Sequence, residues 1–141
     1  MLDTILDAAL VQAYRETAYQ VQGPAPFTLQ VGQASAALAA AHHQHGVDCS
    51  AFITACNPFS RRLDDAANAD RHAALGRELR QRGLPSQEGL GRHPSGDWPG
   101  ETSHLVLGLA RDEACALGRA LEQNAILWAA ADAVPQLILL R

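Results

Sequence analysis

The amino-acid sequence predicts one α+β domain over residues 1–141, built on a ferredoxin-like βαββαβ core at about residues 50–130. The length of 141 residues is that of a single domain. Apolar runs of strand length alternate with segments in which apolar residues recur every three or four positions, as they do in helices. Between Ser50 and Ala130 these segments follow the order strand, helix, strand, strand, helix, strand, which is the ferredoxin-like order.

A helix and a strand–helix unit are expected before this core. Apolar side chains share one helical stripe over about residues 2–18. The alternation in residues 27–31 predicts a short, half-buried strand. Ser35 is a candidate N-cap for the helix that follows, and Gly46 is its candidate C-terminal glycine.

The core elements are marked by their apolar patterns and by signals at their ends. "SAFITA" is apolar enough to be a central strand, and Asp64 or Asp65 can cap a helix that ends before Gly83. The elements, including a closing hairpin strand, are expected at about residues 50–55, 64–82, 84–91, 103–109, 111–123, 125–130 and 136–140. The sheet should be mostly antiparallel, with helices on one face or partly on both.

Composition and charge restrict the class of partner. The formal net charge of −4 disfavours binding to nucleic acid, which depends on neutralising phosphates. No apolar run approaches the roughly 20 residues of a membrane span, and the first residues lack the basic segment of a secretory signal. The three cysteines are an odd number and widely spaced, which favours a reducing compartment. We therefore expect a cytoplasmic protein that binds neither membranes nor nucleic acid.

The segment "TACNPFS" at residues 54–60 is the starting point for a candidate site. It places polar and thiol side chains around a proline directly after a buried strand. In a ferredoxin-like sheet with strand order 4-1-3-2, this strand end lies beside the starts of the third and fourth core strands. Polar residues from distant segments should therefore meet at one sheet edge. The candidate ligand-binding residues are Thr54, Asn57, Ser60, Arg61, Asn68, Trp98, Glu101, Ser103 and Gln123.

The expected ligand is a small polar or anionic metabolite. Side chains such as Asn57 and Glu101 would orient it by hydrogen bonds. The N-terminus of the following helix and Arg61 or Arg62 would hold negative charge, and Trp98 would cover the ligand. No cofactor and no metal is expected, because the histidines of "HHQH" at residues 42–45 lack the cysteine pair of a structural zinc site.

Three other interpretations stay open. The polar residues can be ordinary turn chemistry, since Asn-Pro starts turns and loops collect polar side chains. The rim and the loop at residues 91–102 can instead bind a protein partner, and the first helix can form a homodimer. A small hydrolase or transferase is the third interpretation. Its candidate catalytic residue is Glu101, or Cys56 paired with His93 or His104.

The combined motifs resemble a bacterial family, domain-of-unknown-function family 3293. Members read Thr-Ala-aromatic-Asn-Pro-x-Ser, an Asn in the next helix, Trp-Pro-x-Glu-x-Ser and Gly-Gln-x-Ala. The residues of this chain that match are Thr54, Asn57, Pro58, Ser60, Asn68, Trp98, Pro99, Glu101, Ser103, Gln123 and Ala125. The likeness runs from about Tyr14 to the end of the chain and implies no particular activity. Cys56 stands where relatives have an aromatic residue, which weakens its case as a nucleophile.

Overall fold

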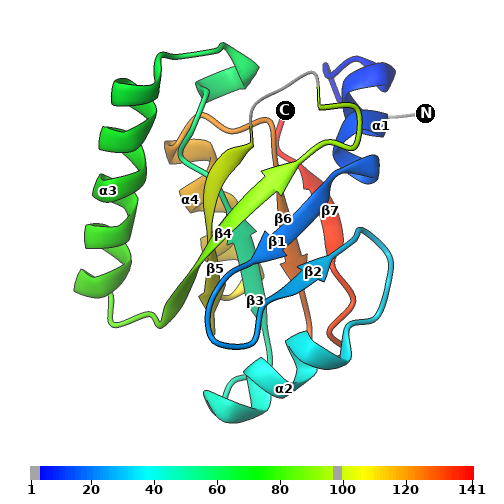
Figure 1. The fold of residues 1–141 in the computed structure, drawn as a ribbon, viewed down its shortest axis with the longest axis vertical. Helices are drawn as coiled ribbons and strands as arrows, with labels where there is room; N and C mark the ends of the chain where they lie inside the picture. Colours follow the sequence, from blue (N-terminus) through cyan, green and yellow to red (C-terminus); the bar gives the residue numbers. More distant parts are fainter. Residues whose placement is uncertain (1–3, 97–99) are drawn as a thin grey trace.

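The computed structural model describes residues 4–96 and 100–141, which form a mixed α/β fold around a curled, antiparallel seven-stranded sheet (Figure 1). The strands are β1 (Ala18–Val21), β2 (Phe27–Leu29), β3 (Ser50–Ile53), β4 (Ser86–Arg92), β5 (Glu101–Leu107), β6 (Ala125–Ala129) and β7 (Gln136–Leu139). The helices are α1 (Ala8–Glu16), α2 (Ala36–Gln44), α3 (Asp65–Gln81) and α4 (Arg111–Ala120), with a short 3-10 helix η1 (Pro58–Ser60). The strand order is β2-β1-β4-β5-β3-β6-β7, and each neighbouring pair is antiparallel. The α+β class predicted from the sequence is confirmed.

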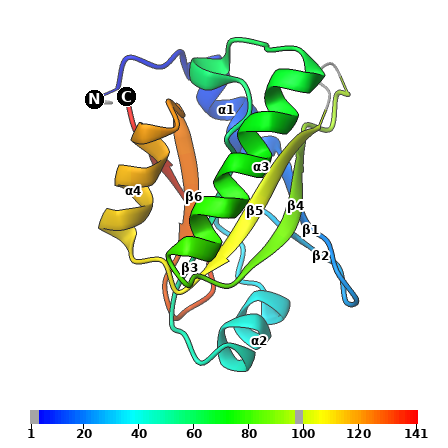
Figure 2. The same ribbon diagram turned by 90° about the vertical axis from the view of Figure 1, so that its left-hand side faces the viewer.

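Helices cover both faces of the sheet (Figure 2). On one face, Leu75 and Leu79 of α3 and Leu117 of α4 belong to a single buried cluster. On the other face, Leu38 of α2 belongs to a second cluster that includes Phe52 of β3. Successive residues of a strand point to opposite faces, so β3 and β5 contribute to both clusters. No described helix is long and apolar enough to cross a membrane.

The pairing at the centre of the sheet brings three strand ends together. Ile53, the last residue of β3, pairs with His104 at the middle of β5, so the first residues of β5 extend past the end of β3. Phe52 pairs with Leu127 in β6. The end of β3 therefore lies beside the starts of β5 and β6, as predicted, and the turn into η1 and α3 leaves from the same edge.

The N-terminal segment differs from the prediction. The helix expected over about residues 2–18 begins at Ala8 and ends at Glu16, and the unpredicted strand β1 follows it. Tyr19 and Val21 are the buried positions of β1, which pairs with both β2 and β4. An alternation over only four residues is too short to be separated from the helical period before it.

Two predicted N-caps are confirmed. The Ser35 hydroxyl accepts a hydrogen bond from the Leu38 N–H at 3.1 Å at the start of α2. The Asp64 carboxylate accepts one from the Ala67 N–H at 2.7 Å at the start of α3. Each cap satisfies an N–H group that a helix end leaves without a partner.

Candidate functional site

The turn after β3 has an unusual backbone. Asn57, Phe59 and Ser60 have φ values of 49°, 52° and 60°. Residues other than glycine rarely adopt this left-handed region, and asparagine tolerates it better than phenylalanine. Such conformations persist where the surrounding structure holds them, and they cluster at functional sites.

Asn57 is the residue that holds this turn. Its Oδ1 accepts hydrogen bonds from the Leu63 N–H and from Asn68 Nδ2, each at 2.9 Å. Its backbone N–H donates to Asn68 Oδ1 at 3.0 Å. Its Nδ2 donates to Glu101 Oε2 at 2.7 Å. Asn57 is only 6% exposed, and it therefore joins the turn, α3 and the start of β5 from a buried position.

Glu101 brings a carboxyl group to the same edge. Burial raises the pKa of Glu101, and the hydrogen bond from Asn57 acts in the opposite direction by stabilising the carboxylate. The group therefore titrates closer to neutral pH than an exposed glutamate. Its position at the first residue of β5 fixes it beside the end of β3.

Arg71 and Gln123 connect the turn to the end of α4. Arg71 of α3 donates from Nε to the carbonyl oxygen of Ala55 at 2.5 Å and from Nη2 to that of Leu121 at 2.7 Å. Gln123 donates from Nε2 to the carbonyl oxygen of Cys56 at 3.0 Å. These bonds satisfy backbone carbonyls that the irregular chain leaves outside the sheet.

Ser60 connects the turn to α1 and to the segment before β6. Its hydroxyl accepts a hydrogen bond from Asn124 Nδ2 at 2.9 Å and lies 3.0 Å from the Tyr14 hydroxyl. Tyr19 donates its own hydroxyl to the Tyr14 carbonyl oxygen at 2.6 Å. Burial raises the pKa of Tyr19, so this donor stays protonated. Helix α1 is thus tied to the turn by polar contacts.

A cavity of about 270 Å³ lies between α1 and the sheet. Its polar lining includes Tyr14, Thr17, Thr54, Asn57, Ser60, His93, Ser95, Glu101, Ser103 and Gln123. Its apolar wall includes Leu10, Ala13, Tyr19, Phe52, Leu127 and Leu137. Among the described lining residues, Glu101 is the only Asp, Glu, Lys or Arg. The cavity therefore combines an apolar body with a polar end that carries one carboxyl group.

Six of the nine predicted site residues line this cavity, two described residues do not, and one lies outside the described residues. Asn68 lies behind Asn57 and holds it, without lining the cavity. Arg61 is exposed at the end of η1 and is not among the described residues that line the cavity. Trp98 lies outside the described residues, as does part of the loop at residues 91–102.

The start of α3 has fewer free N–H groups and more negative charge than the predicted anion site requires. The Ala67 N–H is already bonded to the Asp64 carboxylate, and Asp65 adds a second acidic residue to the first turn. Arg61 and Arg62 are both exposed and neither lines the cavity. A negatively charged ligand in the cavity would face the Glu101 carboxyl group without a described arginine beside it.

The geometry also weakens the case for Cys56 as a nucleophile. Cys56 is 2% exposed and does not line the cavity. Its sulfur lies 3.3 Å from the Thr102 hydroxyl and 3.5 Å from the Thr102 carbonyl oxygen. Within residues 4–96 and 100–141, no histidine hydrogen-bonds to it. A nucleophilic cysteine needs both access and a neighbouring base.

Sequence reasoning missed the apolar half of the site. Leu10, Ala13 and Tyr14 lie on the apolar stripe predicted for the first helix, and they line the cavity. Tyr19 lies on the unpredicted strand β1. The stripe of α1 was a signal for a buried face, but nothing in it distinguishes a packed core from a cavity wall.

The sequence model of the family described as protein of unknown function (DUF3293) matches residues 53–126, just over half of the chain. The matched segment contains the strained turn, Glu101 and Gln123. No curated protein and no solved structure matches the chain significantly. The resemblance drawn from the sequence is thereby confirmed, and the chain belongs to the DUF3293 family, whose function is unknown.

Proposed function

We propose that the protein binds a small ligand in the cavity between α1 and the sheet. The ligand would have an apolar body and one end that donates hydrogen bonds, such as a protonated amine. The observation that carries this proposal is the half-buried Glu101 carboxyl group at the polar end of a largely apolar cavity. Burying a carboxylate costs free energy unless it is paired, and among the described residues only Asn57 donates to it. A donor on the ligand would supply the missing partner.

The rigidity of the polar end supports a binding role. Asn57 is fixed by three hydrogen bonds to Asn68 and Leu63, and it holds the Glu101 carboxyl group in turn. A site whose polar groups are already held in place loses less conformational entropy when a ligand binds. The left-handed backbone at Phe59 and Ser60 costs conformational free energy, which the hydrogen bonds of the turn offset.

The size and chemistry of the cavity narrow the class of ligand. Its volume of about 270 Å³ is slightly below that of pockets for drug-sized molecules. A compact amine, amino alcohol or amide fits this volume better than a nucleotide does. The small polar ligand predicted from the sequence is thereby narrowed to a compact molecule that donates hydrogen bonds. The anionic alternative is disfavoured because the described lining supplies a carboxyl group and no lysine or arginine, and His93 is its only described side chain that can carry a positive charge.

A thermal-shift screen with matched variants tests the proposal. The panel would contain small apolar amines and amino alcohols, with the corresponding carboxylic acids and sugar phosphates as comparison classes. Unfolding a chain of this length changes the entropy by about 0.3 kcal/mol/K, so a ligand at 100 times its dissociation constant should raise Tm by about 9 °C. The shift should disappear in Glu101→Gln and persist in Arg61→Ala. Shifts produced only by the anions, or amine shifts unchanged in Glu101→Gln, would contradict it.

A catalytic role for Glu101 is the second candidate function. Its raised pKa suits a general acid or base, and the Ser103 and Thr54 hydroxyls line the same cavity. The test is the NMR spectrum of each ligand that binds, followed over hours with wild type and with Glu101→Gln. Chemical change with the wild type alone would establish catalysis. No change with either protein would leave binding as the function.

We also infer that β3–α3–β4–β5–α4–β6 is a ferredoxin-like unit extended by the β1–β2 hairpin and by β7. The strand order β6-β3-β5-β4 supports this, because it is the 4-1-3-2 order in the numbering of the unit. The antiparallel pairing of these strands supports it too. A parallel pair or another strand order in an experimental structure would contradict it.

A further inference from the structure

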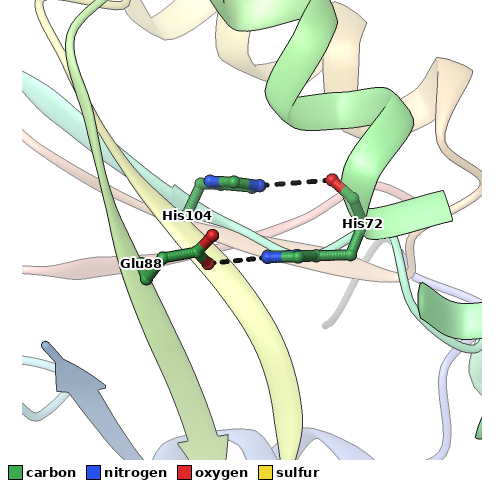
Figure 3. Close-up of side chains that lie close together, drawn as sticks. All are labelled: His72, Glu88 and His104. Carbon is green, nitrogen blue, oxygen red and sulfur yellow. Dashed lines mark hydrogen bonds and ion pairs between the residues drawn. The ribbon is translucent and has the colours of Figure 1, made fainter. Parts of the chain in front are cut away.

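Three side chains of the kind that bind metal ions meet on the sheet face opposite the cavity (Figure 3). His72 comes from α3, Glu88 from β4 and His104 from β5. One nitrogen of each imidazole and one carboxylate oxygen all lie within 4.8 Å of one another. Glu88 and His104 are direct partners in the antiparallel pair of β4 and β5, which puts both side chains on the face that α3 covers.

Some of the nitrogen and oxygen atoms that could bind a metal ion have only weak hydrogen bonds or none in the described part of the chain. His72 Nε2 lies 2.6 Å from Glu88 Oε2, in a strong contact. The two imidazole rings stack at 4.2 Å between centroids, with 9° between their planes. His104 Nε2 lies 3.4 Å from the His72 carbonyl oxygen, which is long for a hydrogen bond. His72 Nδ1 is buried and has no hydrogen-bond partner among the described residues.

We propose that His72, Glu88 and His104 form a binding site for a divalent transition-metal ion, with Zn²⁺ as the reference ion. Two imidazoles and one carboxylate are a donor set that Zn²⁺ accepts at about 2.0–2.2 Å, and three protein ligands leave a position for water. The same set suits other divalent ions of this series, such as Co²⁺ and Ni²⁺. This site lies outside the cavity and is independent of the function proposed for it.

The cluster needs only a local adjustment to hold an ion. Tetrahedral ligands at these bond lengths lie about 3.4 Å apart, so the donor atoms must approach by roughly 1.4 Å at most. His72 Nε2 and Glu88 Oε2 are 2.6 Å apart, so these two atoms must separate by about 0.8 Å. Stacked parallel rings do not direct their nitrogens at one point, so the His104 ring must turn. Turning it gives up the stack and the long contact to the His72 carbonyl oxygen.

Charge and access are compatible with an ion at this place. Burial is the main cause that lowers the pKa of His104, which favours the neutral imidazole that a metal ion needs. Arg80 also lowers the pKa of His104 and opposes a second cation, whereas the Glu88 carboxylate favours one. The side chains of Glu88 and His72 are 58% and 16% exposed, which gives an ion a path from solvent.

Zinc titration of the wild type and of two pairs of variants tests the site. The protein would be treated with chelator, dialysed and titrated with Zn²⁺ by calorimetry, and Co²⁺ spectra would identify the ligands. We expect one ion per chain and a loss of affinity of about 100-fold or more in Glu88→Gln and in His72→Gln. The exposed histidines near the end of α2 supply the matched controls, His43→Gln and His45→Gln, which should bind as the wild type does.

The result that would overturn the site is equally specific. Wild type that binds no Zn²⁺ at about 10 μM, or Glu88→Gln and His72→Gln that bind like the wild type, would exclude it. A thiolate charge-transfer band with Co²⁺ would assign the ion to one of the three free cysteines instead. Circular dichroism of each variant checks that a lost affinity is not a lost fold. If His72→Gln fails that check, Glu88→Gln alone decides, because Glu88 is exposed and its replacement leaves the packing of α3 intact.

Discussion

Replacing Asn57 with alanine tests whether this residue organises the candidate site. The substitution removes three side-chain hydrogen bonds, from Leu63 and Asn68 and to Glu101. A neutral hydrogen bond contributes about 1 kcal/mol and one to a charged acceptor about 1.5–3 kcal/mol. Alanine at φ 49° adds roughly 1 kcal/mol of backbone strain. Water that enters from the cavity will recover part of the Glu101 bond, so the free energy of unfolding should fall by about 3–5 kcal/mol.

A glycine substitution at the same position separates the free energy lost with the hydrogen bonds from the free energy lost to backbone strain. Asn57→Gly removes the same hydrogen bonds, but glycine adopts positive φ without a steric penalty. It should therefore be more stable than Asn57→Ala by several tenths to about 1 kcal/mol, despite the greater flexibility that glycine gives the unfolded chain. Arg61→Ala, four residues away and exposed, is the control for a change in the turn that touches no buried contact.

Urea unfolding followed by circular dichroism measures all three variants, and calorimetry provides an independent value. The loss in Asn57→Ala corresponds to a decrease in Tm of about 10–17 °C for a chain of this length. A decrease in the free energy of unfolding below about 1 kcal/mol would refute the central role of Asn57. Alanine more stable than glycine would refute the part assigned to the left-handed backbone.

Two further substitutions test the charge of the site and the packing beneath it. The folded-state pKa of Glu101 is raised above its ordinary value of 4.5, so the wild type should lose stability relative to Glu101→Gln as the pH rises from 4.5 through the folded pKa. Urea unfolding between pH 4 and 8 measures the gap, and a gap that instead opens on acidification contradicts the direction of the shift. Gly89→Ala would place a Cβ 2.7 Å from the Phe52 ring and 2.9 Å from the Gln20 carbonyl oxygen, and it should cost about 2–3 kcal/mol of stability. Thermal unfolding in a Phe52→Leu background should show a smaller loss, and an equal loss there would assign the clash to the backbone contact alone.

The polar end of the site was predictable because strand order determines which chain ends meet. Thr54, Asn57 and Gln123 follow or precede central strands, and the antiparallel order of β3, β5 and β6 brings these ends to one edge. The polar residues of that edge could therefore be named without knowing any side-chain contact. Asn68 was named for the same reason, although it supports Asn57 and does not reach the cavity.

The sequence did not predict strand β1, the exposed position of Arg61 or the pairing of Glu88 with His104. Strand β1 has four residues and directly follows a helix, so its alternation merges with the helical stripe. Arg61 was predicted to be a site residue because it follows Ser60 in the chain. It comes directly after the left-handed turn at Phe59 and Ser60, and it is exposed to solvent. The pairing of Glu88 with His104 depends on strand register, which one sequence does not specify.

Strand β5 shows how two candidate sites can lie on opposite faces of one small sheet. Its residues alternate between faces, so Glu101 and Ser103 point to the cavity while His104 points to α3. Side chains that are adjacent in sequence are thereby separated by the thickness of the sheet. Substitutions at Glu88 should then leave the ligand response of the cavity unchanged, and substitutions at Glu101 should leave zinc affinity unchanged. A dependence of one on the other would mean that the two faces move together through β4 and β5, because each of these strands contributes residues to the cavity lining and to the metal cluster.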